Sequence, residues 1–276
     1  MRNIPIILFL TLCLSLINVF YVHNFHFPID KITENTNYLT KYIQFRLSSP
    51  DDTSFNHNFC ESKLNGNKGP EYWNAYSSLI ISVVPFLLGF PKYPLLYNVA
   101  CMLSVNGIAS YHYHYYLSWS GKQGDEISMI LANYFGMWGL INMYYHKSEG
   151  RNSLNRYNTA FMYLFLVANT LLENDALFPS IFGVYVGGSL IMIYKVGKKY
   201  QMQYFHHLVI SFIGASGWII AEHFCNEYTM YGHPLWHLLF PLGFYRLLLD
   251  FDKIKCPSNS VRVRTLSNIP EDKHEV

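Results

Sequence analysis

The stretch SYHYHYYLSWSGKQGDE, residues 110–126, decides how this chain is organised. Within it, Ser110 and His114 are four residues apart, so a helix would present both on one face. Asp125 follows His114 after eleven residues. A hydroxyl, an imidazole and a carboxylate at these spacings predict part of a polar site.

A second stretch far downstream, GHPLWH at residues 232–237, repeats the four-residue spacing with His233 and His237. Both stretches lie in otherwise apolar segments. Ionisable groups in apolar surroundings are costly unless they are paired or used. We therefore predict that the two stretches form a single site.

The composition predicts a membrane protein. Apolar residues make up 51% of the chain and charged residues only 14%, whereas roughly 25% of the residues of a soluble domain are charged. So few charges cannot coat a water-soluble surface. The net charge of +2 is small, and no nucleic acid is expected as a partner; the sequence predicts nothing about protein partners. The five cysteines form neither a zinc-finger spacing nor a CxxC motif.

Hydrophobic segments predict an all-α, polytopic membrane protein with a seven-transmembrane-helix bundle and an additional N-terminal hydrophobic segment. Residues 1–23 are either a cleaved signal peptide or a signal-anchor helix. Residues 24–70 form an arm, 71–252 the membrane domain and 253–276 a tail. The seven segments run over residues 72–90, 94–117, 125–145, 157–172, 178–195, 204–221 and 233–251.

The basic residues predict the orientation of the bundle, because cytosolic connections are enriched in Lys and Arg. One set of connections and the tail carry most of them, whereas the opposite set carries Lys122 and little else. We therefore expect a cytosolic C-terminus and a lumenal or extracellular arm. The basic residues in the first set of connections are Lys92, Lys147, Arg151, Arg156, Lys195, Lys198 and Lys199.

In this topology the polar residues of the two stretches all lie at the lumenal end of the bundle. They are Ser110, His114, Asp125, His233 and His237. Three neutral imidazoles suit a catalytic zinc ion, which keeps one position open for water. Zinc would acidify that water and polarise a carbonyl. Asp125 would then act as the general base, and Ser110 would donate to the oxyanion. The alternative is that these groups only hydrogen-bond helices together, which explains any one histidine but not the whole set.

With these residues in place, the sequence resembles the alkaline ceramidase family. This family belongs to a wider group of seven-helix membrane hydrolases that includes the adiponectin and progestin receptors. The resemblance covers about residues 55–252. It implies that three histidines bind zinc, with the serine and the aspartate beside the metal. The matching residues are Cys60-Glu61, Glu71-Tyr72-Trp73-Asn74, Ser110, His114, Asp125-Glu126, His233 and His237.

The resemblance also implies a calcium site in the arm, and here the sequence departs from the family. Asn58 stands in place of an aspartate, and Phe59 in place of a tryptophan that offers its backbone carbonyl. Glu61 and Glu71 are kept, but Lys63 puts a cation where an asparagine ligand belongs. Asn65 could substitute for that asparagine if the gap in the arm, which is about two residues shorter, falls earlier. Since calcium needs six to eight oxygens, two interpretations stay open: a calcium site, or a helix cap at Glu71 with a solvated loop.

A similar disulfide in the family implies a bridge between Cys60 and Cys225, which a lumenal location permits. The resemblance further implies zinc-dependent cleavage of the N-acyl bond of ceramide, or of dihydro- or phytoceramide, giving a sphingoid base and a fatty acid. The expected location is the endoplasmic reticulum or Golgi, with the plasma membrane next. The alternatives are a receptor of the progestin or adiponectin type with a zinc site, and a metal-free membrane scaffold.

Overall fold

The computed structural model describes residues 59–66, 69–145, 148–171 and 177–256, and within these ranges the chain forms helices and no strand. The all-α prediction is confirmed, and each of the seven predicted segments overlaps one long helix. The elements are α4 (Cys60–Leu64), α5 (Tyr72–Leu88), α6 (Pro94–Tyr116), α7 (Trp119–Tyr144), α8 (Ser148–Leu171), α9 (Leu177–Tyr200), α10 (Phe205–His223), the 3₁₀ helix η3 (Thr229–Tyr231) and α11 (Gly232–Lys255).

Two of these helices, α9 and α10, are long and apolar enough to cross a membrane, judged by length and composition. The apolar α5 is shorter, at 17 residues. The predicted N-terminal hydrophobic segment, 1–23, and all but the first residues of the predicted tail lie outside the described residues.

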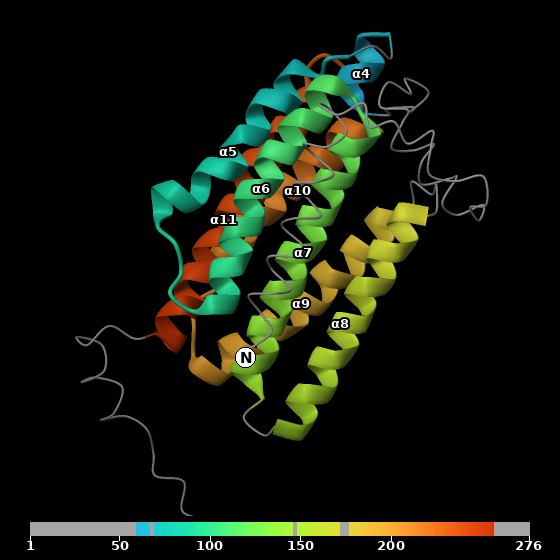
Figure 1. Ribbon diagram of the computed structural model, residues 1–276. Helices are drawn as coiled ribbons and strands as arrows, with labels where there is room; N and C mark the ends of the chain where they lie inside the picture. The colour runs from blue at the N-terminus through green and yellow to red at the C-terminus, as the bar shows by residue number, and fades with distance from the viewer. Residues whose placement is uncertain (1–58, 67–68, 146–147, 172–176, 257–276) are drawn as a thin grey trace, which may run out of the picture.

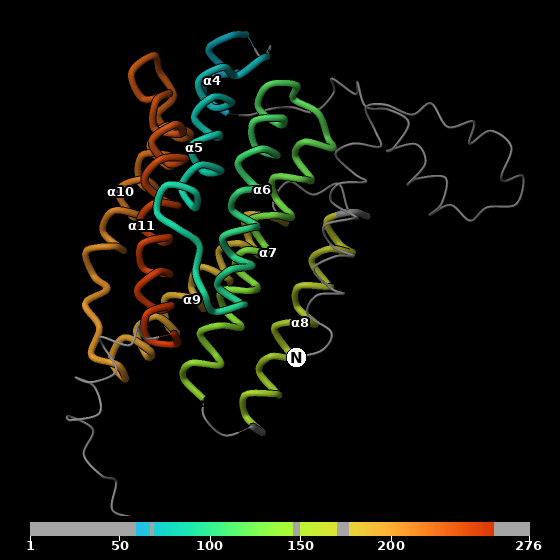
Figure 2. Tube along the Cα trace, turned by 60° about the vertical axis from the view of Figure 1, so that its left-hand side comes forward, coloured from blue at the N-terminus to red at the C-terminus, as the bar shows by residue number. Residues whose placement is uncertain are grey.

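The long helices run roughly alongside one another as a bundle (Figure 1). Helices α5, α6 and α7 pack in sequence, α10 packs on α11, and α11 returns against α5. Helix α8 packs mainly on α7 and stands at the edge of the bundle (Figure 2). The core between them is closed by large buried side chains such as Tyr134, Phe165 and Tyr245.

The connection α5–α6 and the end of α11 lie at the end of the bundle opposite α4 (Figure 1), and lysines make several contacts there. The backbone N–H of Lys92 donates to Asp252 Oδ1 over 2.9 Å. The ammonium groups of Lys199 and Lys255 reach carbonyl oxygens at the end of α7, at 2.7 and 3.4 Å. The connection α5–α6 and the ends of α7, α9 and α11 thus lie at the same end of the bundle.

Glycines allow the helices to approach closely at the α4 end. A Cβ on Gly232 would lie 2.0 Å from the carbonyl oxygen of Gly217, so the start of α11 touches α10 backbone to backbone. A Cβ on Gly107 of α6 would lie 2.7 Å from the carbonyl oxygen of Ser78 in α5. These contacts fix where α6 and α11 present their polar side chains.

Candidate metal centre

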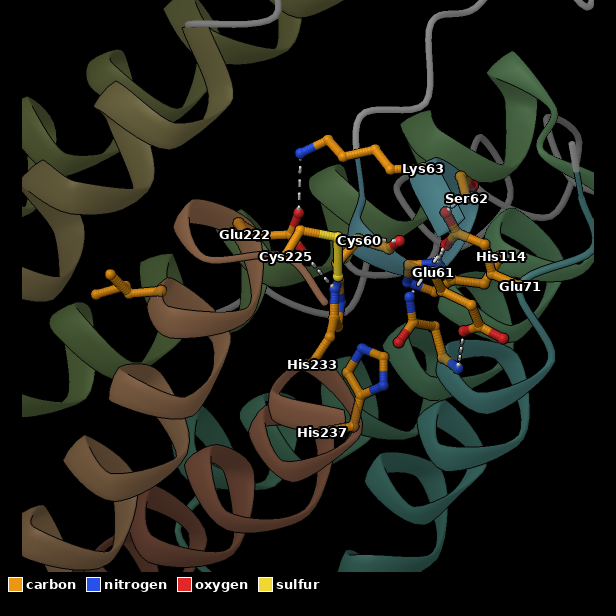
Figure 3. A network of polar contacts seen from close by, with 12 residues as sticks. Cys60, Glu61, Ser62, Lys63, Glu71, His114, Glu222, Cys225, His233 and His237 are labelled. Atoms are coloured by element: carbon orange, nitrogen blue, oxygen red, sulfur yellow. Dashed lines mark hydrogen bonds and ion pairs between the residues drawn. A yellow bond between two sulfur atoms is a disulfide. The ribbon is translucent and has the colours of Figure 1, made fainter. Parts of the chain in front are cut away.

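Three histidines meet at the α4 end of the bundle. His114 comes from the last turn of α6, and His233 and His237 come from the first two turns of α11. One ring nitrogen of each lies within 4.8 Å of the others, and all three side chains are buried. Figure 3 shows the rings facing a common point. The structure thus brings together the three residues that the sequence proposes as zinc ligands.

Two of these histidines have a carboxylate at Nδ1. His114 Nδ1 lies 2.5 Å from Glu71 Oε2, and both side chains are almost fully buried. His233 Nδ1 lies 3.4 Å from Glu222 Oε1 (Figure 3). Because a carboxylate only accepts, each Nδ1 carries a proton, so the neutral imidazole that would bind a metal has its lone pair on Nε2.

The third histidine meets a hydroxyl instead. His237 Nδ1 lies 2.8 Å from Ser77 Oγ, and Ser77 Oγ donates to the carbonyl oxygen of Asn74 over 3.1 Å. When Ser77 donates to that carbonyl, its oxygen accepts the Nδ1 proton of a neutral His237. His237 Nε2 is then unprotonated as well.

The donor set therefore fits a zinc ion. A histidine that ligates a metal usually donates its other ring N–H to a carboxylate, carbonyl or hydroxyl, which fixes the tautomer and the ring orientation. All three histidines here have that arrangement, with Nε2 left for the metal.

Replacing Ser77 by Ala is expected to weaken zinc binding about 10- to 100-fold, because His237 loses the acceptor that holds its tautomer. The measurement is zinc affinity of the purified protein by competition with a chromophoric chelator. Ser82→Ala is the matched control, since Ser82 lies on the same helix and bonds Ser104 instead. Equal affinities for all three proteins would contradict the assigned role of Ser77.

The predicted base and oxyanion donor lie next to the histidines. Asp125 Oδ1 accepts from Asn106 Nδ2 over 2.8 Å, and Ser110 lies beside the Asp125 carboxylate. Ser78 Oγ lies 3.0 Å from Ser110 Oγ and 3.4 Å from His237 Nδ1. A continuous polar network thus joins the carboxylate of α7 to a histidine of α11.

The arm lies directly over this network. A disulfide joins Cys60 of α4 to Cys225 in the connection before α11, with Cα atoms 5.2 Å apart. The ring of Phe59 packs against His114 and His233, at centroid distances of 5.2 and 4.7 Å. Phe59, the residue before α4, therefore covers the histidine cluster with its aromatic ring.

The glutamates of the arm are occupied by hydrogen-bond donors. Both carboxylate oxygens of Glu61 accept backbone N–H groups at the start of α5, from Trp73 at 2.9 Å and Asn74 at 3.0 Å. Glu71 accepts from the Ser62 hydroxyl and from His114. The expected cap at Glu71 is thus corrected: Glu71 is the N-cap residue by position, but its side chain makes no cap, and Glu61 satisfies the helix N–H groups instead.

Burial raises the pKa of Glu61, against the backbone N–H groups of Trp73 and Asn74, which lower it. Burial by itself would also raise the pKa of Glu71, but the hydrogen bond and charge of His114 outweigh it and lower that pKa to about 2. Glu71 is therefore an ionised acceptor for the Nδ1 proton of His114. Of the other residues named for calcium, Lys63 lies beside Glu222, and Asn58 falls outside the described residues.

Four residues of the site were not predicted from the sequence: Ser77, Ser78, Asn106 and Glu222. Two of them carry a usable signal. Asn106 stands four residues before Ser110, so it shares that helix face. Glu222 is the only acidic residue of α10, and an isolated acid in an apolar segment is a candidate functional residue.

A mostly apolar pocket opens between α5, α6, α7, α9 and α11. Asn106, which bonds Asp125, is one of its few polar lining residues. The pocket therefore borders the polar network directly. Its larger lining side chains include Ile81, Leu96, Phe182, Trp236, Phe240 and Phe251.

The comparisons with known proteins identify the family of this chain. The family model "Ceramidase" matches residues 51–268. Alkaline ceramidase 1 of Mus musculus is 23% identical over 233 residues, which cover 74% of this chain and 83% of that protein. The resemblance noted in the sequence is thereby confirmed at the level of the family. Since the family model spans most of the chain, including all three histidines, this protein belongs to the ceramidase family.

Proposed function

We propose that this protein is a zinc-dependent amidohydrolase that cleaves the N-acyl bond of ceramide or a close relative. The observation that carries the proposal is the buried set of three histidines, each oriented at Nδ1 by an oxygen, beside Asp125 and Ser110. Membership of the ceramidase family supports hydrolysis of ceramide, and the similar mouse protein is named an alkaline ceramidase.

When bound, zinc would acidify a water molecule and polarise the amide carbonyl. Asp125 takes the proton of the attacking water on Oδ2. Asn106 holds the carboxylate in place by donating a hydrogen bond to Oδ1. The Ser110 hydroxyl, which lies beside Asp125, donates to the developing oxyanion. Asp125 then passes the proton to the amide nitrogen as the C–N bond breaks, giving fatty acid and sphingoid base.

The apolar pocket suits the lipid chains of such a substrate. Its aromatic and aliphatic lining excludes water, and its edge at Asn106 adjoins the proposed base. An amide near a lipid headgroup would sit at the α4 end while the chains extend along the helices. This depth matches a site near one end of the bundle.

We also propose that all seven long helices cross the membrane. Large apolar side chains on the outer surface support this placement; Leu87 is 77% exposed and Phe205 75%. Other large apolar side chains on several helices are exposed as well, among them Phe86 at 70% and Leu164 at 64%. The gathered basic residues would face the cytosol and the arm the lumen of the endoplasmic reticulum or Golgi.

The experiment that tests this function uses purified protein with ceramide labelled in the acyl chain, and both products are measured. Equal amounts of fatty acid and sphingoid base are expected from the wild type and none from His114→Ala. A receptor of the related seven-helix group is the second candidate. Bound zinc without any release from ceramide, dihydroceramide or phytoceramide would overturn the hydrolase and favour the receptor.

A further inference from the structure

The residues at the calcium positions of the family do not fit a calcium ion in this chain. Calcium requires six to eight oxygen ligands. Both oxygens of Glu61 receive backbone N–H groups, and those of Glu71 receive Ser62 and His114. The carbonyl oxygen of Phe59 accepts the N–H of Lys63 over 3.0 Å as part of α4.

The arm instead carries a cation of its own, which pairs with α10. Lys63 Nζ is 3.8 Å from Glu222 Oε2 (Figure 3). Lys63 follows Cys60 by three residues, and Glu222 precedes Cys225 by three. The ion pair and the disulfide therefore span the same interface between α4 and the end of α10, about one helical turn apart.

The ion pair also continues to the proposed metal centre. The second oxygen of Glu222, Oε1, lies 3.4 Å from His233 Nδ1. Glu222 is only 14% exposed, so its charge is poorly solvated and needs a partner. The positive charge of Lys63 lies beside one carboxylate oxygen of Glu222. The other oxygen faces Nδ1 of His233.

We propose that the arm of this protein is held without calcium. The ion pair between Lys63 and Glu222 ties α4 to the end of α10, and Glu222 is a positioning residue that links the arm to His233. The link to zinc rests on the proposed function, whereas the independence from calcium does not.

The first test titrates calcium into purified wild-type protein in calcium-free buffer prepared without a chelator, so that bound zinc stays. A calcium ion at about 100 times its dissociation constant would raise Tm by roughly 5–10 °C in a domain of this size. We expect no rise in Tm and no binding by calorimetry up to millimolar calcium. A calcium-dependent rise in Tm would overturn the proposal.

The second test compares Lys63→Met with Lys63→Arg and with Lys253→Met. Lys253 lies at the opposite end, is 76% exposed and pairs with Asp250. Lys63→Met is expected to lower Tm and to weaken zinc binding several-fold, Lys63→Arg to restore both, and Lys253→Met to change neither. Glu222→Ala should weaken zinc binding about 10- to 100-fold.

Unchanged zinc affinity and Tm in both Lys63→Met and Glu222→Ala would overturn the positioning role. None of these measurements uses ceramide. Calcium independence with intact zinc binding but no hydrolysis would therefore count against the proposed function alone. Hydrolysis with a calcium-raised Tm would count against the inference alone.

Discussion

Replacing Asp125 by Asn is expected to lower ceramide turnover by about 10²–10⁴-fold while leaving bound zinc unchanged. The amide keeps the shape of the side chain and can still face Asn106 and Ser110, but it cannot take a proton from water. The measurement is kcat on ceramide in detergent micelles, with zinc content determined on the same preparation.

The matched control for this change is Glu126→Gln. Glu126 is the adjacent acid of α7, and its Oε2 accepts from Asn169 rather than facing the histidines. Its amide variant should turn over ceramide at close to the wild-type rate. If Asp125→Asn kept wild-type kcat with zinc in place, Asp125 would not be the base.

Replacing His237 by Ala is expected to remove zinc and to abolish turnover, with activity falling by at least about 10³-fold, or roughly 4 kcal/mol of barrier. A catalytic zinc ion is normally held by three protein ligands. A site with two histidines and solvent therefore binds zinc much more weakly than a site with three histidines. Metal analysis of the purified variant should give far less than the about one zinc per chain expected of the wild type.

His207→Ala is the control for loss of a buried imidazole. His207 is also buried but lies toward the opposite end of the bundle, where its Nε2 is 2.9 Å from Asp250 Oδ2. This variant should lose some stability and keep its zinc. Full zinc occupancy in His237→Ala would remove this histidine from the ligand set.

The helices and the position of the three histidines could be predicted from the sequence because they rest on local patterns. Apolar runs of nearly membrane-spanning length predict long helices, and an alternating direction places the end of α6 and the start of α11 together. The four-residue spacing then sets His233 and His237 on one face. No contact between distant side chains was needed for these predictions.

The partners of the histidines could not be predicted in this way. Ser77 reaches His237 only because α5 packs against α11, and Glu222 reaches His233 only because Gly217 and Gly232 let α10 and α11 touch. Such contacts depend on helix rotation and separation, which hydrophobic patterns do not specify to better than a few ångströms.

The arm shows the same limit for charged residues. Glu61 and Glu71 look equivalent as oxygen ligands in the sequence, yet one caps α5 and the other holds His114. From the sequence alone, Lys63 appears only as a loss of a calcium ligand. Its ion pair with Glu222 becomes known only from the structure. Which neighbour a carboxylate selects is decided by tertiary packing.

The most direct test of the account removes and restores zinc in the purified wild-type protein and follows ceramide hydrolysis throughout. Release of fatty acid and sphingoid base should stop when the metal is removed and return in proportion to the zinc added back. Hydrolysis that continues at its original rate after metal analysis shows the zinc gone would contradict the central claim.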